Sequence, residues 1–513
     1  MIENGLLHSG PQLAHFEFLV GTVPKRSDIL CSMSALVLLL LLQAQLTPAD
    51  LSAISGALRD KQFAIAVELT HQRLAKDEQD PRLWTLQGLA HAGLSQLSEA
   101  LKDFRHAVTL APNYLPALKA EAQLEYAAHD EQSLTTLHRI LALEPSDVVS
   151  HAMLGSLAYQ RQDCEAAVTN YAASEKLIEA QVPALTEYGQ CLFQQGQKSQ
   201  AIRAFEKAVA LDSHSWQARY NLAVADLLSH HAGEALQAMQ PALDSRDQPP
   251  SQILDLAASA YEQMGDTPQA VSTLRQAIIN DPANSALYLH FADLSLAHNS
   301  FQTGISMLNA GFQKLPNSAP LHLARGVLYV QLGQYERADH DFAQAAQLDS
   351  TQAFSSVAQG LTQLQRSNVD GALAITRKQL QQNPKDGYLH YLKAEALRQK
   401  GAEPGTPAFD EALAAAEAAV RLKPKFPLAE DLLGTFYLRQ NRLETARQQF
   451  EKVLQVEPDN ESALYHLIVA SRKSGRAAEL PGLMKRLAEA KVLQKNQEER
   501  RNRYTFVEPE KNR

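Results

Sequence analysis

The feature that most constrains this chain is a 34-residue repeat of small side chains. From Thr47 onward the 513-residue sequence can be set out in steps of 34, with a one-residue slip at two joints and a six-residue slip at a third. The thirteen repeats begin at residues 47, 81, 115, 148, 182, 216, 251, 285, 319, 353, 387, 427 and 461. A single hydrophobic core stops growing at roughly 250 to 300 residues, so a repeat array is the natural way to fold a chain of this length.

Small residues occupy two positions in nearly every repeat. Position 8 is Gly or Ala in eleven of the thirteen repeats, and position 20 is Gly or Ala in eleven as well. We interpret positions 8 and 20 as the place where two antiparallel helices touch, because any side chain larger than a methyl group would push them apart. The larger residues at position 24 are expected to pack against a neighbouring repeat; they include Phe104, Tyr171, Phe205, Phe342 and Phe450.

Glycine and proline mark the ends of the two helices in each repeat. Position 15 is Gly196, Gly265, Gly333, Gly401 or Gly475 in five repeats, where we expect a left-handed turn to end the first helix. Proline at position 32, as in Pro112 and Pro282, prevents the second helix from continuing. The sequence therefore predicts an all-α fold in which each repeat is a helix-turn-helix hairpin.

The second repeat carries the fullest pattern, with Trp84, Gly88, Ala100, Phe104, Ala107 and Pro112 at positions 4, 8, 20, 24, 27 and 32. This pattern resembles the tetratricopeptide repeat family, and the resemblance extends from about Thr47 to Lys491. It implies a right-handed superhelical solenoid of about thirteen helix-turn-helix repeats. The predicted organisation is an N-terminal lead and signal peptide or anchor over residues 1–46, the array over 47–490, and a basic C-terminal capping helix and tail over 491–513. Within that tail, a docking peptide around Tyr504 to Val507 is the alternative.

The amino-terminal segment has the layout of an export signal. Residues Ile29 to Leu42 contain no charge and follow Lys25 and Arg26. A membrane-spanning helix needs about 20 apolar residues, whereas the core of a signal peptide needs about 7 to 15. We therefore predict an exported protein of the bacterial type, periplasmic or in the cell envelope, with cleavage near Ala44 or Ala49. Anchoring in the inner membrane through residues 29–42 is the alternative.

Charge and motifs argue against several classes of function. The formal net charge of −9 leaves no broad basic surface for phosphates, so nucleic acid is not an expected partner. The seventeen histidines are scattered, and the sequence has no HExxH motif and no paired Cys-x-x-Cys. We expect no cofactor, no metal site and no enzymatic activity, with an unrecognised site on the array as the remaining alternative.

Cysteine usage leaves two interpretations open. Cys31 lies in the segment that export would remove, which leaves Cys164 and Cys191. We interpret these two as small buried residues at helix packing positions, and a single bridge in an oxidising compartment is the alternative.

The resemblance implies that other proteins or peptides bind on a concave face lined by the first helices, through positions 2, 5, 9 and 12. In the third to fifth repeats these positions form what we term the polar lining: Lys119, Gln123, Tyr126, Ser156, Tyr159, Thr186, Gln190 and Phe193. In the eighth to tenth repeats they form what we term the apolar strip: Leu289, Leu296, Leu323, Val327, Val330, Phe354, Val357, Leu361 and Leu364. Both are candidate binding surfaces for the assembly of a multiprotein complex. The alternative for the apolar strip is that it packs against another turn of the solenoid or completes the core.

Overall fold

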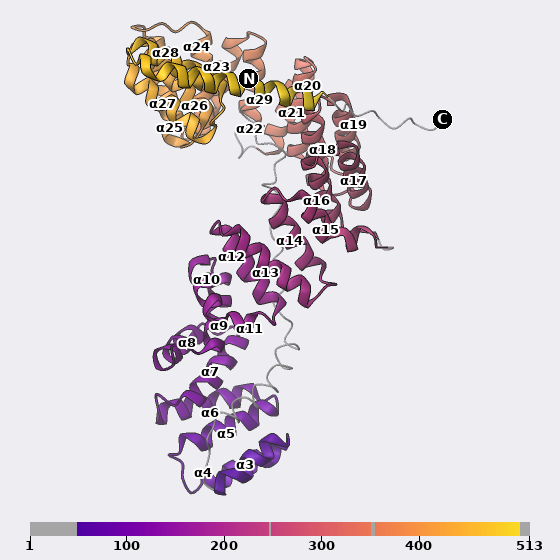
Figure 1. Cartoon of the computed structure of the whole chain (residues 1–513), viewed down its shortest axis with the longest axis vertical. Coiled ribbons are helices and arrows are strands. Elements are labelled where there is room, and N and C mark those ends of the chain that lie inside the picture. Colours follow the sequence, from indigo (N-terminus) through magenta and orange to yellow (C-terminus); the bar gives the residue numbers. More distant parts are fainter. Residues whose placement is uncertain (1–48, 246–247, 350–353, 503–513) are drawn as a thin grey trace, which may run out of the picture. The chain divides into compact units, whose positions relative to one another are not determined.

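The structure, a computed structural model, describes residues 49–502 apart from 246–247 and 350–353 (Figure 1). Over these residues the chain is helical and contains no strand, which confirms the predicted all-α solenoid. The predicted signal or anchor over 1–46 and the proposed docking peptide at Tyr504 to Val507 lie outside the described residues. None of the described helices combines the length and the apolar character that a membrane-spanning helix needs.

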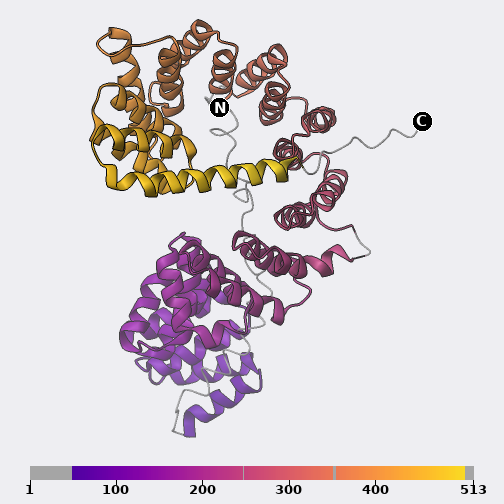
Figure 2. The same cartoon turned by 45° about the horizontal axis from the view of Figure 1, so that its top comes forward.

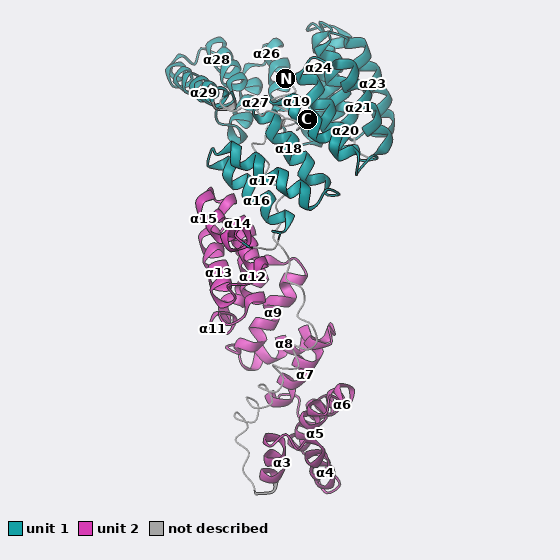
Figure 3. Cartoon of the chain, turned by 90° about the vertical axis from the view of Figure 1, so that its right-hand side faces the viewer, with its two compact units in different colours: residues 1–13, 245–513 teal, residues 14–244 magenta. Residues whose placement is uncertain are grey.

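The chain divides into two compact units at Asp244 and Ser245 (Figure 3). The described helices of unit 2 are α3 (Ala49–Arg59), α4 (Phe63–Leu74), α5 (Pro81–Gly93), α6 (Leu97–Leu110), α7 (Leu115–Ala127), α8 (Gln132–Leu143), α9 (Val148–Gln160), α10 (Cys164–Ala173), α11 (Glu175–Ile178), α12 (Val182–Gln194), α13 (Lys198–Leu211), α14 (Trp216–Leu228) and α15 (Ala232–Leu243). Those of unit 1 are α16 (Ser251–Gln263), α17 (Thr267–Asn280), α18 (Ser285–Ala297), α19 (Phe301–Phe312), α20 (Ala319–Gln331), α21 (Tyr335–Leu348), α22 (Phe354–Gln365), α23 (Val369–Gln382), α24 (Gly387–Gln399), α25 (Pro407–Leu422), α26 (Pro427–Arg439), α27 (Leu443–Val456), α28 (Glu461–Lys473), the 3-10 turn η2 (Ala477–Glu479) and α29 (Leu480–Arg501).

Each repeat is a hairpin of two packed helices, as predicted. The first helix starts at the expected first residue in eleven of the thirteen repeats, for example at Pro81 in α5 and at Glu461 in α28. Side-chain caps help to fix these starts. Asp147 accepts from the backbone N–H of Ser150 at 2.9 Å, and Asp386 accepts from that of Tyr388 at 2.8 Å.

Position 15 adopts the left-handed conformation in every repeat. The five glycines predicted to do so have φ between 69° and 87°. The other eight residues have φ between 52° and 64°: Lys61, Ser95, His129, Gln162, His230, Asn299, Ser367 and Asn441. A left-handed conformation costs a non-glycine residue about 1 to 2 kcal/mol, so the packing of the two helices, and not the residue type, imposes this turn.

The close contact inside each hairpin differs from the predicted one. In five repeats the glycine at position 8 lies under the aromatic ring at position 24 of the same repeat, and a Cβ added there would come within 2.4 to 2.8 Å of the ring. These pairs are Gly88 with Phe104, Gly155 with Tyr171, Gly189 with Phe205, Gly326 with Phe342 and Gly434 with Phe450. The predicted meeting of position 8 with position 20 is therefore wrong for these glycines, because the ring fills that space.

Residue sizes at positions 8 and 24 compensate for each other along the array. Where position 8 is alanine, position 24 is His138, Met239, Leu274, Leu308 or Ala416, and never Phe or Tyr. Position 20 is small for a different reason. All ten alanines at position 20 are fully buried, and at Gly304 an added Cβ would approach Leu328 of the next repeat at 2.7 Å. Position 20 therefore controls the spacing to the next repeat as well as the spacing within the hairpin.

The carboxyl-terminal helix of unit 1 is longer than a repeat requires. α29 begins as the second helix of the thirteenth repeat and continues without a break to Arg501, so the domain boundary expected at 490 falls inside it. Figure 2 shows α29 as one long yellow helix within unit 1. Just beyond its end, the Oδ1 of Asn502 accepts a hydrogen bond of 2.8 Å from the Nδ2 of Asn299, 203 residues earlier in the chain.

Candidate partner-binding surfaces

The polar lining forms a connected surface on the first helices α7, α9 and α12. Gln123, Tyr126 and Tyr159 remain partly exposed, whereas Gln190 is buried. The hydroxyl of Tyr159 donates to the Gln190 side-chain oxygen of the next repeat. Tyr126 is hydrogen-bonded to Ser156, also one repeat further on. Neighbouring repeats thus share hydrogen bonds along this face, while its tyrosine residues and Gln123 stay partly exposed.

Lys119 is held inside the array. Its Nζ lies 2.6 Å from Asp147 Oδ1 and 2.7 Å from Glu144 Oε2, both in the connection to the fourth repeat. Burial alone would lower the pKa of Lys119, but the hydrogen bonds to Asp147 and Glu144 outweigh it and raise the pKa. Since Asp147 also caps α9, this lysine joins two repeats. Its predicted role in binding a partner stays a prediction.

The apolar strip is largely covered. Val327, Val330, Val357, Leu361 and Leu364 are buried and belong to one hydrophobic cluster of unit 1. Leu289, Leu296 and Leu323 are half-buried. The cause is direct contact between first helices, since α18 packs on α20 and α22 packs on α24. The side chain of Phe354 lies outside the described residues. Binding through this strip stays a prediction. Because Leu361 is buried, Leu361→Asp would disturb folding before it disturbed binding.

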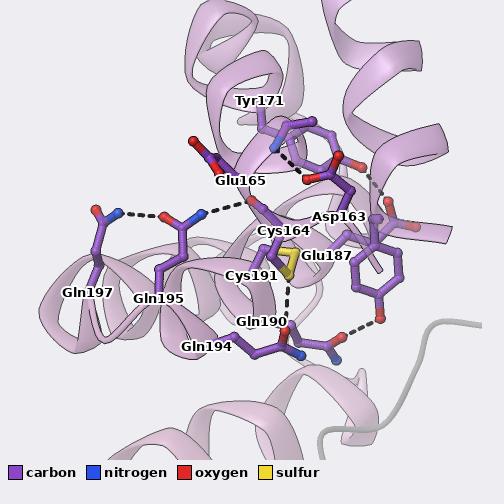
Figure 4. The surroundings of a disulfide bond; sticks show 12 residues. Asp163, Cys164, Glu165, Tyr171, Glu187, Gln190, Cys191, Gln194, Gln195 and Gln197 are labelled. Carbon is purple, nitrogen blue, oxygen red and sulfur yellow. Dashed lines mark hydrogen bonds between the residues drawn. A yellow bond between two sulfur atoms is a disulfide. The ribbon is translucent and has the colours of Figure 1, made fainter. Parts of the chain in front are cut away.

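Cys164 and Cys191 form a disulfide between the fourth and fifth repeats (Figure 4). This corrects the preferred interpretation as two unlinked core residues, although Cys191 is fully buried as expected. The bridge joins the start of α10 to the last turn of α12 and stands next to Gln190. Beside it the Nε2 of Gln195 donates to the backbone oxygen of Cys164 at 3.0 Å. This joint of unit 2 is therefore tied both covalently and by hydrogen bonds.

One buried group has the constituents of a hydrolase triad. His290 Nδ1 lies 2.6 Å from Asp255 Oδ1, and His290 Nε2 lies 3.4 Å from Ser259 Oγ. Ser259 is only 2% exposed and sits in the middle of α16, where the backbone N–H groups are used within the helix and cannot form an oxyanion hole. Its hydrogen bonds connect the seventh and eighth repeats.

Among the described residues, no cluster of three or more His, Cys, Asp or Glu side chains could hold a metal ion.

Glu187 lies on α12 next to the polar lining, and it is not among the candidate residues predicted from the sequence. It occupies position 6, outside the four positions taken to face a partner, and it is the only acidic residue at position 6 in the thirteen repeats. An acidic residue at this one position 6 was the feature of the sequence that could have identified Glu187. The hydroxyl of Tyr171 donates to Glu187 Oε2. Burial raises the pKa of Glu187, while the hydrogen bonds from Tyr171 and Ser156 act in the opposite direction.

Comparison with known protein families agrees with the observed hairpins. Models of the tetratricopeptide repeat match residues 81–114, 182–215, 253–286, 319–352, 408–455 and 432–490. Three of these matches start at the first residue of a repeat, at 81, 182 and 319.

Among curated proteins, the chain is similar to Superkiller protein 3 of Schizosaccharomyces pombe, with 22% identity over 297 residues. The match covers 54% of this chain but only 20% of that protein, so the chain spans about a fifth of the length of this relative. Among solved structures, yeast Tom70 has 15% identity and a TM-score of 0.42, with 92% of this chain and 96% of that chain covered. A tetratricopeptide repeat protein from Parabacteroides merdae has 19% identity and a TM-score of 0.38, with 56% and 98% covered.

Proposed function

We propose, from the premise that this chain is a tetratricopeptide repeat protein, that it is an exported scaffold whose polar lining in unit 2 binds extended peptide segments of other proteins. The fold is suited to protein–protein interaction. The finer assignment rests on one contrast between the two candidate surfaces. The polar lining keeps Gln123, Tyr126 and Tyr159 partly exposed, whereas most of the apolar strip is buried in the core of unit 1.

The chemistry of the polar lining suits the backbone of a peptide. Phenol and amide groups can both donate and accept hydrogen bonds, as the N–H and C=O groups of an extended chain require. Tyrosine adds apolar contact area and loses little conformational entropy on binding. A scaffold that holds peptide segments in this way would serve in the assembly of a multiprotein complex.

Site-specific photo-crosslinking tests this assignment. With benzoylphenylalanine in place of Gln123 on α7, we expect a defined crosslinked partner in the native cell. The same group in place of Thr135, which is exposed on α8 of the same repeat, should give none. Equal crosslinking at the two positions, or crosslinking at Thr135 alone, would place the binding surface elsewhere.

Export is proposed from the uncharged run Ile29 to Leu42 together with the disulfide, because structural disulfides form and persist mainly in oxidising compartments. Of the two predicted cleavage regions, the one near Ala44 leaves α3 whole. A mature start at Leu51 would remove the first two residues of α3 and make the buried Leu51 the new terminus. We expect intact-mass measurement of the native protein to give a mature terminus near Leu46. An unprocessed terminus that retains Lys25 would instead support the inner-membrane anchor.

A further inference from the structure

We propose that Glu187, together with Tyr126, Tyr159 and Tyr171, forms a specificity site in the polar lining that takes an arginine side chain of the bound peptide. This inference rests on the proposed function and names the chemistry of the partner. The four side chains come from α7, α9, α10 and α12, so the site exists only when the third, fourth and fifth repeats are stacked.

The geometry gathers the three phenols around one carboxylate. Tyr171 is fully buried and donates its hydroxyl to Glu187 Oε2. Tyr159 is partly exposed, and burial followed by the negative charge of Glu187 raises its pKa to about 12. The charge of Glu187 also acts on Tyr126, whose pKa is raised mainly by burial. Hydrogen bonds place the groups together, because Tyr126, Tyr171 and Glu187 are each bonded to the Ser156 side chain. The hydroxyl of Tyr159 donates to Gln190, which lies one turn after Glu187 on α12.

The carboxylate is held by hydroxyl groups and not by a cation. Within the described ranges no Lys, Arg or His side chain pairs with Glu187, and the groups that stabilise its charged form are Tyr171 and Ser156. A carboxylate removed from water without a countercharge is costly, and a well-placed cation from a partner offsets part of that cost. Glu187 as a residue also remains partly exposed and is not sealed in the core.

Arginine fits this surrounding better than other cations. Its planar guanidinium can donate to a carboxylate and at the same time stack on the face of a tyrosine ring. Arginine pairs in this chain show the same combination: Arg325 binds Asp341 at 2.7 Å and lies 4.3 Å from the centroid of the Phe312 ring. A peptide that runs along the polar lining would place one arginine at Glu187 and its backbone against the Tyr and Gln groups on either side.

Selection from a random heptapeptide display library against the full oxidised protein tests the proposal. We expect the selected peptides to be enriched in arginine, and replacing that arginine by citrulline in a synthetic peptide should weaken binding at least about tenfold by calorimetry. With the Glu187→Gln variant the same replacement should change affinity by less than about twofold. Glu165→Gln removes an exposed acid from α10 and should behave as wild type.

A second variant tests the site independently, in case Glu187→Gln fails to fold. Tyr126→Leu keeps an apolar side chain but removes a ring from the site. We expect it to weaken the arginine peptide more than the citrulline peptide, because both lose the contact of the Tyr126 phenol with the peptide but only the arginine peptide loses a cation–π contact. Peptides that bind the polar lining without a basic residue would overturn the arginine site and leave the proposed function standing. If no peptide is enriched at all, both fail. Equal affinity of wild type and a correctly folded Glu187→Gln for the arginine peptide also overturns the inference.

Discussion

Gly326→Ala is expected to lower the stability of unit 1 by about 2 to 3 kcal/mol, although alanine is the better helix former. The added Cβ would lie 2.4 Å from the Phe342 ring, which is fully buried. Urea unfolding followed by far-UV circular dichroism should show an earlier transition. Both tryptophans, Trp84 and Trp216, lie in unit 2, so the fluorescence transition should stay where it is in the wild type.

The compensating residue sizes at positions 8 and 24 suggest a second substitution that should restore the stability lost in Gly326→Ala. Phe342→Leu alone should destabilise unit 1 by leaving a cavity above Gly326. The double variant reproduces the Ala and Leu pairs of the seventh and eighth repeats, so we expect it to be more stable than the sum of the single effects by about 2 kcal/mol. Gly233→Ala, on an open face of α15, is the control and should stabilise unit 2 slightly. Additive effects in the double variant would show that the ring does not restrict position 8.

Reducing the Cys164–Cys191 bridge is expected to lower the unfolding free energy of unit 2 by roughly 3 kcal/mol. The bridge closes a loop with a sequence separation of 27, and in the chain-entropy model a loop of this length restricts the unfolded state by an amount of that order. Urea unfolding followed by tryptophan fluorescence, with and without a phosphine reductant, measures the difference. Cys164→Ala with Cys191→Ala is the control and should not respond to the reductant.

The state of the two cysteines can also be read directly. Peptide mapping of the unreduced protein should recover residues 164 and 191 in one linked fragment. Two unlinked fragments from the native source would contradict the bridge and would remove one of the two supports for export.

Most of the fold followed from the sequence because its causes are local. The turn at position 15 depends on helix ends a few residues away, and the starts of α5, α12 and α28 coincide with the residues expected from the period alone. The size exchange between positions 8 and 24 was also present in the sequence, in pairs such as Gly88 with Phe104. The recurrence of small residues alone pairs position 8 with position 20 and does not indicate which side chain covers the glycine.

The candidate sites followed less well, because their properties depend on contacts between repeats. Spacing puts Tyr159 and Gln190 on one predicted face, and in the structure these two side chains are hydrogen-bonded to each other. Spacing could not tell that Leu361 would be buried, since this depends on how closely α22 approaches α24. Spacing also could not predict the bridge between Cys164 and Cys191, because side-chain volumes along the whole interface set the distance between two repeats.

The hydrogen bond between Asn299 and Asn502 has a consequence for the order of folding events. Stacked hairpins form through contacts between residues that are near in sequence, so any part of such an array can fold early and quickly. A contact across 203 residues is different, because the loop it closes becomes short in space only when the intervening hairpins are in place. The docking of α29 beside the turn at Asn299 is therefore a late event in folding. Energy transfer between a donor dye near Asn299 and an acceptor dye near Asn502 would measure when unit 1 completes its folding.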